Sequence, residues 1–184
     1  MTLTDFLKYF GSFVICQVNP IYTHSSLRMT FKNHKSNYTK IKVSETGKYL
    51  ISLYQDNERS MKLKYQNFRY SPARVIVMKT GNKWEYVDSC QHSEAYSVSV
   101  EVDLVEGAEY IVSGKFTWRH WQEREGCLTV YGPDKVEFET VDRDIAPVFK
   151  MEMIESFFKK NRGKTKDYNK IGCIGAYSES LFSL

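Results

Sequence analysis

The sequence predicts a mainly β fold: an antiparallel β-sandwich with a short N-terminal helix and, at the other end, a helix followed by an extended tail. Three observations predict it. Apolar and polar residues alternate in many short segments, turn residues separate those segments, and helical spacing occurs only near the two ends. Clean alternation gives a strand one buried face and one solvated face, which is typical of antiparallel sheets.

The first segment, residues 1–16, predicts a short helix followed by a strand. Thr2 stands three residues before Asp5, which is the spacing of a capping pair. Phe6 and Leu7 then begin a short apolar face. We therefore expect a helix of one or two turns here.

Residues 17–145 carry the strand signals of the sandwich. The clearest signal lies over residues 96–104, where Val98, Val100 and Val102 alternate with polar residues. Further strands are predicted within residues 27–32, 40–44, 49–54, 73–79, 84–87, 110–118, 128–131 and 136–141. Short strands separated by turn residues favour a β-sandwich over a sheet with helical crossovers.

The C-terminal part predicts an amphipathic helix over residues 146–162 and an extended tail over residues 163–184. Apolar residues repeat at helical spacing in the first of these segments, at Val148, Met151, Ile154 and Phe158. We expect this helix to dock on the sandwich or on a partner. The tail shows no periodicity, yet it keeps four apolar candidates for anchoring the chain to a partner protein: Ile171, Ile174, Leu181 and Phe182.

Composition narrows the function classes. The chain has 184 residues, which suits one domain, and its net charge of +4 is spread too evenly for a nucleic-acid footprint. The sequence has no run of 18 apolar residues, and its N-terminal region lacks the features of a secretory signal. We expect a cytoplasmic protein that does not bind nucleic acid, and membrane attachment is disfavoured.

The sharpest local feature is residues 117–126, where a predicted strand runs into a polar loop. Tryptophan and arginine anchor many protein interfaces, because each buries a large area. The segment therefore supplies four candidate partner-binding residues: Trp118, Arg119, Trp121 and Arg124. Two alternatives stay open. Trp118 can complete the core face and leave only Trp121 at the surface, or the tryptophans can insert among lipid headgroups.

Several segments resemble the calpain family of cysteine proteases. Residues 5–10, DFLKYF, and 15–19, ICQVN, resemble the junction where the calpain protease core ends and its β-sandwich, domain III, begins. Residues 70–76, YSPARVI, and 107–112, GAEYIV, resemble segments of that sandwich, especially in calpain-like proteins of ciliates. The resemblance implies that the chain opens with a remnant of the protease-core end and continues as a domain III sandwich.

The resemblance implies the fold and not the chemistry. A calpain nucleophile is a cysteine at a helix N-terminus with a histidine partner, which an asparagine orients. Cys16, Cys90 and Cys127 have no such surroundings, so we expect no catalytic residues and no enzyme activity. The family's sandwich is similar to calcium-dependent lipid-binding domains, which raises calcium as a candidate. Calcium needs several converging carboxylates, and the acids here are scattered, so we expect no cofactor and no metal.

These observations predict a non-catalytic calpain-like β-sandwich that acts as a structural or protein-interaction subunit of a larger, stable assembly. The ciliate resemblance and the modest basic charge suggest a cytoskeletal assembly such as a ciliary microtubule lattice, because tubulin surfaces are acidic. The alternative is a regulatory or membrane-targeting module that accompanies a calpain-type cysteine protease. A further alternative is the non-catalytic fragment of such a protease, with the catalytic part upstream of Met1.

Overall fold

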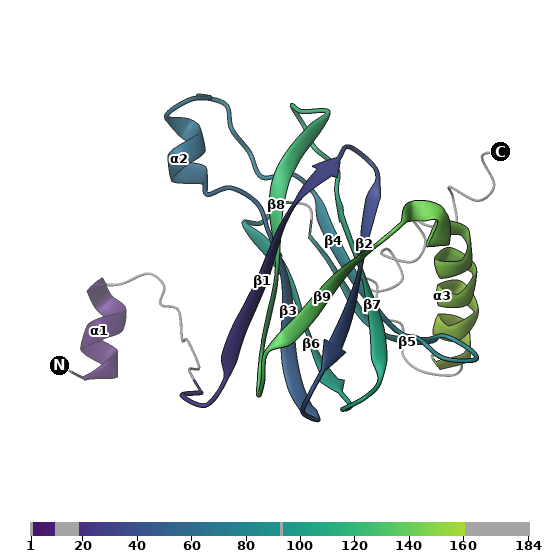
Figure 1. Ribbon diagram of the computed structural model, residues 1–184. Helices are drawn as coiled ribbons and strands as arrows, with labels where there is room; N and C mark the ends of the chain where they lie inside the picture. The colour runs from purple at the N-terminus through teal and green to yellow at the C-terminus, as the bar shows by residue number, and fades with distance from the viewer. Residues whose placement is uncertain (1, 10–18, 93, 161–184) are drawn as a thin grey trace.

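The chain folds into two antiparallel sheets packed face to face, as the computed structural model shows for residues 2–9, 19–92 and 94–160 (Figure 1). The first sheet has the order β1 (Thr23–Lys32), β8 (Glu123–Gly132), β3 (Gly47–Tyr54) and β6 (Ser97–Leu104). The second has the order β5 (Glu85–His92), β4 (Ala73–Lys79), β7 (Glu109–Phe116), β2 (Ser36–Val43) and β9 (Val136–Val141). The predicted mainly β, antiparallel sandwich is confirmed.

The strand order is that of a jelly roll with one added strand. The pairs β1–β8, β2–β7, β3–β6 and β4–β5 are all antiparallel, as in a long hairpin wrapped around a core. The pairs β3–β8 and β4–β7 then join neighbouring turns of that wrap within each sheet. β9 extends the second sheet by pairing with β2. This wrap brings segments that are far apart in the sequence together at each end of the sandwich.

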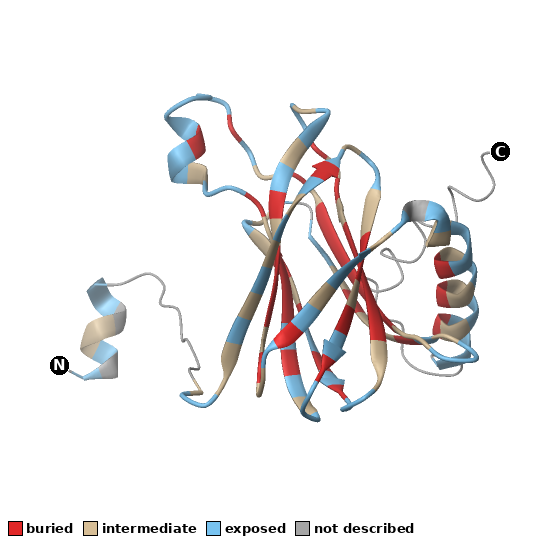
Figure 2. Ribbon diagram, viewed as in Figure 1, coloured by how far each residue is buried: buried red, intermediate tan, exposed pale blue. Residues whose placement is uncertain are grey.

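The main core lies between the inner faces of the two sheets (Figure 2). Alternate residues of each strand point inward, and fully buried examples are Phe31, Ile51 and Val77. Two buried tyrosines, Tyr49 and Tyr110, satisfy their hydroxyls at one end of the core. The Tyr49 hydroxyl donates to the Glu45 carbonyl at 2.8 Å, and the Tyr110 hydroxyl accepts from the Val105 amide at 2.9 Å.

A second core forms on the outer face of the second sheet, which α3 (Ala146–Lys160) covers after a short 3-10 turn, η1 (Arg143–Ile145) (Figure 1). The inward face of α3 presents Phe149, Met153 and Phe157. They pack on apolar residues of the sheet, namely Tyr38, Ile76, Met78, Tyr86 and Ile111. The Lys160 ammonium donates to the Val87 carbonyl at 2.6 Å and fixes the end of the helix. The predicted helix is therefore present over Ala146–Lys160 and docked on the sandwich, but the predicted stripe is wrong as the docking face, because its residues Val148, Met151 and Phe158 are exposed.

Two short helices complete the described chain. In α1 (Leu3–Tyr9) the Asp5 amide donates to the Thr2 hydroxyl at 3.2 Å, and that hydroxyl donates to the Asp5 carboxylate at 2.7 Å, which confirms the capping pair. The second, α2 (Glu58–Lys62), was not predicted from the sequence; Asn57 caps it by accepting from the Arg59 amide at 2.8 Å. Residues 10–18 and 161–184 lie outside the described residues. The first predicted strand and four tail anchors fall there and stay predictions: Ile171, Ile174, Leu181 and Phe182.

Candidate interaction surface

Four loops meet at one end of the sandwich, the end near which α2 projects in Figure 1. We call it the loop end and define it as residues 33–35, 55–72, 94–96 and 117–122. Hydrogen bonds cross between these loops. The Asn33 amide donates to the Gln122 carbonyl at 2.6 Å, and the Arg119 guanidinium donates to the Tyr70 carbonyl at 3.1 Å. All four sequence-predicted candidates within the described residues, Trp118 to Arg124, lie at or beside this end.

Trp118 belongs to the core and is only 4% exposed. Its ring stacks on Phe116 with the centroids 4.3 Å apart, and its indole N–H donates to the Phe31 carbonyl at 2.8 Å. The Asn33 side chain makes two hydrogen bonds with the Trp118 backbone: it accepts from the amide at 2.7 Å and donates to the carbonyl at 3.2 Å. Because the alternation of β7 continues past Phe116, position 118 also points inward. Trp118 is therefore not a partner-contacting residue.

Trp121 is half-buried and joins two loops. Its ring meets Tyr65 edge-on with the centroids 5.7 Å apart and lies 6.1 Å from Phe68, both on the loop that carries α2. The Arg124 guanidinium stacks over the same ring, 4.2 Å from its centroid. Such a cation–π contact contributes about 0.5–1 kcal/mol at a partly exposed site. Trp121 therefore packs against the α2 loop, and only part of its ring is exposed at the surface.

Arg124 and Arg119 hold the loops in place. Two nitrogens of the Arg124 guanidinium lie 2.6 Å from one Asp56 carboxylate oxygen, and one of them also donates to the Met61 sulfur at 3.0 Å. The Arg119 guanidinium forms an ion pair with Glu94 at 2.7 Å. Surface ion pairs contribute up to about 1 kcal/mol each. Both arginines therefore tie loops of the chain together, and their role as partner contacts stays a prediction.

Gln55, which was not predicted from the sequence, joins the base of the α2 loop to its surroundings. Its buried side-chain amide donates to the Ser71 carbonyl at 2.9 Å and to the Ala95 carbonyl at 2.8 Å. Its oxygen accepts from the Ser71 amide at 3.0 Å. One glutamine therefore joins both ends of the loop to the neighbouring connection. A single glutamine in a polar stretch carries no sequence signal of burial.

The tip of the α2 loop is largely exposed (Figure 2), and both apolar and cationic residues are exposed on it. Leu63 is 90% exposed and Tyr65 is 49% exposed. The same loop carries four exposed cations: Arg59, Lys62, Lys64 and Arg69. Lys62 forms an ion pair with Glu58 at 2.7 Å, whereas in the described part of the chain no ion pair includes the other three. The tip therefore combines an exposed leucine with uncompensated positive charge.

A second apolar strip lies on the outer side of α3. Val148, Met151 and Phe158 are exposed, the last two to 63% and 64%. Helical spacing places these residues opposite the face that carries Phe149 and Met153 and packs on the sheet. Within α3 as the structure describes it, the exposed cations are Lys159 and Lys160, both at the C-terminal end of the helix. The strip therefore serves as a comparison surface of similar apolar character.

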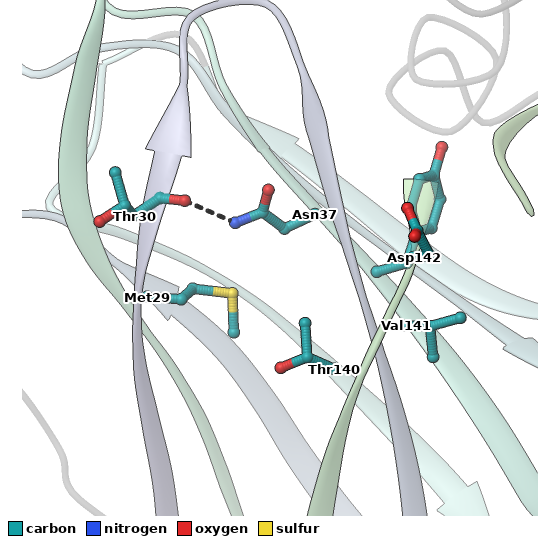
Figure 3. A pocket seen from close by; sticks show the side chains of 7 residues that line it. Met29, Thr30, Asn37, Thr140, Val141 and Asp142 are labelled. Carbon is teal, nitrogen blue, oxygen red and sulfur yellow. Dashed lines mark hydrogen bonds between the residues drawn. The ribbon is translucent and has the colours of Figure 1, made fainter. Parts of the chain in front are cut away.

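A groove of about 610 Å³ opens between β1 of the first sheet and β2 and β9 of the second (Figure 3). Met29 and Thr140 face it, and the Asn37 side-chain amide donates to the Thr30 carbonyl at 2.8 Å across its mouth. Among the described residues its lining holds neither a histidine nor a cysteine. In the same part of the chain, its polar lining consists of Thr30, Asn37, Tyr38, Thr140 and Asp142.

The scattered acids are used in separate contacts. Asp56 binds Arg124, Glu101 pairs with Lys48 at 3.0 Å, and the Ser44 hydroxyl donates to Asp134 at 2.6 Å. Within residues 2–9, 19–92 and 94–160, no three His, Cys, Asp or Glu side chains lie close enough together to hold a metal ion. Over the same ranges, no helix has the length and apolar character needed to cross a membrane.

Comparisons with known proteins assign no family. No family model matches the chain, and no curated protein matches it. Among solved structures, the chain is similar to the Yersinia pseudotuberculosis-derived mitogen, with 13% sequence identity and a TM-score of 0.43. That match covers 65% of this chain and 97% of the mitogen. A similarity at this level carries no inference about function.

Proposed function

We propose that this chain is a non-catalytic, calpain-like β-sandwich that serves as a protein-interaction subunit of a larger assembly, and that the loop end docks its partner. One observation carries the proposal: Leu63 is 90% exposed on a loop that side-chain hydrogen bonds tie to the sandwich at its base. A side chain on an ordered loop loses little conformational freedom on binding, so more of its burial energy appears as affinity. Full burial of a leucine contributes about 2 kcal/mol.

The charges around Leu63 indicate the chemistry of the partner. Arg59, Lys64 and Arg69 are exposed and lie on the same loop. Complementary charge accelerates association and favours correct partners over wrong ones. The partner surface would therefore be acidic and would offer a small apolar pocket to Leu63. The resemblance to calpain-like proteins of ciliates makes a cytoplasmic, cytoskeletal lattice such as ciliary microtubules the first partner class to test.

The test is a native pull-down of the full chain in three forms, followed by mass spectrometry. The first is the natural chain, and the second carries Leu63→Ser with Lys64→Glu. The third carries Met151→Ser with Lys159→Glu on the outer strip of α3, as a matched control. We expect the second form to recover at least about ten times less partner and the control to match the natural chain. The reverse pattern, with both variants folded by circular dichroism, would refute the loop-end assignment.

The alternative function is a membrane-targeting or regulatory module beside a calpain-type protease, or a fragment of one. The same observation favours its membrane form, because a leucine among cations also suits an anionic bilayer surface. Co-sedimentation with phosphatidylcholine vesicles, with and without phosphatidylserine and calcium, tests it. Binding that requires phosphatidylserine and is lost in Leu63→Ser would favour the membrane module. Recovery of a papain-like chain in the pull-down would favour the regulatory one.

A further inference from the structure

A polar pocket of about 180 Å³ opens on the outer face of the first sheet, at the loop end. The strand register places Cys127 of β8 directly opposite both Arg28 of β1 and Tyr54 of β3. Cys127 and Tyr54 alternate with the core residues Leu128 and Leu53, so their side chains lie on the outer face. Besides Arg28, Tyr54 and Cys127, the described lining residues are Gln55, Asp56, Asn57, Tyr96, Glu125 and Gly126. The sheet therefore supplies one side of the pocket, and the loop end supplies the other.

Two tyrosine rings give this pocket an apolar side. The rings of Tyr54 and Tyr96 meet edge-on with their centroids 5.3 Å apart. Tyr96 is 41% exposed, and Tyr54 is half-buried. Tyr96 also contacts Tyr70, with the ring centroids 6.1 Å apart, which limits the positions that the Tyr96 ring can adopt. Aromatic rings beside a few placed polar groups are the usual lining of a small-molecule site.

The polar groups of the lining include both hydrogen-bond donors and acceptors. One carboxylate oxygen of Asp56 is used within the chain, and the second can accept from a ligand. The Asn57 side-chain oxygen accepts from the Arg59 amide, so its NH₂ group can donate to a ligand. Glu125 and Arg28 are exposed and supply a further acceptor and a further donor. The pocket can therefore satisfy groups that donate and accept at the same time.

The charges at this pocket are balanced. Each of the two carboxylates in the described lining lies near an arginine: Asp56 is 2.6 Å from Arg124, and Glu125 is 3.8 Å from Arg28. A charged ligand would have to compete with these pairs, whereas a neutral ligand would not. The contacts of Asp56 and of the buried Gln55 side chain hold the connection after β3 in place before a ligand arrives, which lowers the cost of binding. The lining therefore favours a neutral ligand that is rich in hydroxyl groups.

We propose that this pocket binds one ring of a neutral carbohydrate. The C–H face of a pyranose ring is apolar and would pack on the two tyrosine rings. The ring hydroxyls, each of which can donate and accept, would bond to Asp56, Asn57 and Glu125. The pocket has about the volume of six water molecules at roughly 30 Å³ each, which suits a single sugar ring. This site is separate from the proposed docking of a partner at Leu63, which is not among the lining residues.

The test is an NMR titration of the full chain with four neutral trisaccharides: maltotriose, cellotriose, mannotriose and N-acetylchitotriose. The readout is the chemical shift of the Tyr54 ring and Asn57 side-chain amide signals. We expect a saturable shift with at least one of these sugars, and an affinity at least about ten times weaker in Tyr96→Ala. The matched control is Tyr65→Ala, because Tyr65 has a similar exposed fraction, 49%, and lies on the loop end but not among the lining residues. The affinity of this control should stay within about twofold of the natural chain.

A second variant, Glu125→Ala, changes only an exposed side chain and should weaken binding at least about threefold. The absence of a saturable shift with all four sugars would overturn the site, and so would an equal affinity in Glu125→Ala and the natural chain. A shift of the same signals with choline, but with none of the sugars, would also overturn it, because tyrosine rings beside carboxylates can hold a cation. The methyl glycoside of the binding sugar separates the sources of the ligand. Equal binding of this glycoside supports a glycan attached to another molecule, whereas preference for the reducing sugar supports a free one.

Discussion

The two ends of the sandwich are built in different ways. We call the end opposite the loop end the turn end and define it as residues 44–46, 105–108 and 133–135. Its connections are short, and the Gly107 amide donates to the Val43 carbonyl at 3.4 Å. The loop end instead contains an 18-residue connection, residues 55–72, whose shape depends on side chains such as Gln55 and Arg124. Short backbone turns close the turn end, whereas side-chain hydrogen bonds and ion pairs determine the shape of the loop end.

The two ends also differ in charge and in what they expose. The turn end carries Glu45, Glu106 and Asp134 against the single cation Lys135. The loop end carries an excess of cations around Leu63, and each of its acids, Asp56, Glu58 and Glu94, is in an ion pair. This difference indicates that the turn end mainly closes the core, whereas the exposed residues of the loop end are not required for folding. Substitutions at each end can test this division.

The largest expected effect is beside the turn end, at the last residue of β8, with Gly132→Ala. A Cβ atom at position 132 would overlap the ring of Tyr49, which is fully buried and cannot move aside. Overpacking of this kind costs about 3 kcal/mol of unfolding free energy. Urea unfolding measures it. The control is Gly81→Ala, where the nearest atom to the new Cβ is the Lys83 carbonyl oxygen at 3.5 Å, so we expect little change. Equal stability of the two variants would contradict the description of the turn end.

The next effect is at the base of the loop end, with Gln55→Ala. The substitution leaves the buried Ser71 amide and two carbonyl groups without their partner. We expect a loss of about 2 kcal/mol. Amide hydrogen exchange should accelerate at Ser71 and across residues 57–70. Gln66→Ala, at an exposed position of the same loop, should leave both readouts unchanged. Unaltered exchange in Gln55→Ala would show that the loop does not depend on this residue.

A smaller effect is expected for Arg124→Ala, which removes the contacts to Asp56, Met61 and the Trp121 ring. These contacts are partly exposed, so we expect a loss of about 1 kcal/mol. The amides of α2 should exchange faster, while those of β3 should not. Arg28→Ala is the matched control, because its pair with Glu125 is long, at 3.8 Å, and exposed. Loosening in the control, but not in Arg124→Ala, would contradict the role of Arg124.

The smallest effect concerns the pH response of the turn end. The Ser44 hydroxyl and the Lys135 amide both donate to Asp134 and hold its pKa below the usual 3.8. Because the folded pKa is lowered, the stabilisation is present above pH 3.8 and is lost as the pH falls through the folded pKa. An NMR titration of the Asp134 carboxyl should give a midpoint below 3.8. Ser44→Ala should raise that midpoint, and an unchanged midpoint would contradict the contact.

The same contrast separates what the sequence could predict from what it could not. The strand at Val98, Val100 and Val102 was predictable, because alternation is a local signal. The helix α3 was predictable for the same reason. The tie between Asp56 and Arg124 joins residues 68 positions apart, and only the wrapped strand order brings them together. No local pattern reports such a contact.

The segment at residues 117–126 shows the limit most clearly. Its two tryptophans were both candidates for the surface, and the choice depended on where the alternation of β7 ends. The structure carries that alternation on to Trp118, so this residue joins the core while Trp121 lies beside Phe68. The tip residue Leu63 was missed because α2 has only five residues, which is too short for a periodic pattern.

The measurement that tests the central claim most directly is photo-crosslinking from each end of the sandwich. A photoreactive amino acid is placed at position 63 in one chain and at position 135, on the turn end, in another, and both are irradiated in native extract. We expect a covalent adduct with a partner protein from position 63 and none from position 135. An adduct from position 135 alone, with the partner still recovered by the chain carrying the probe at 63, would contradict the account.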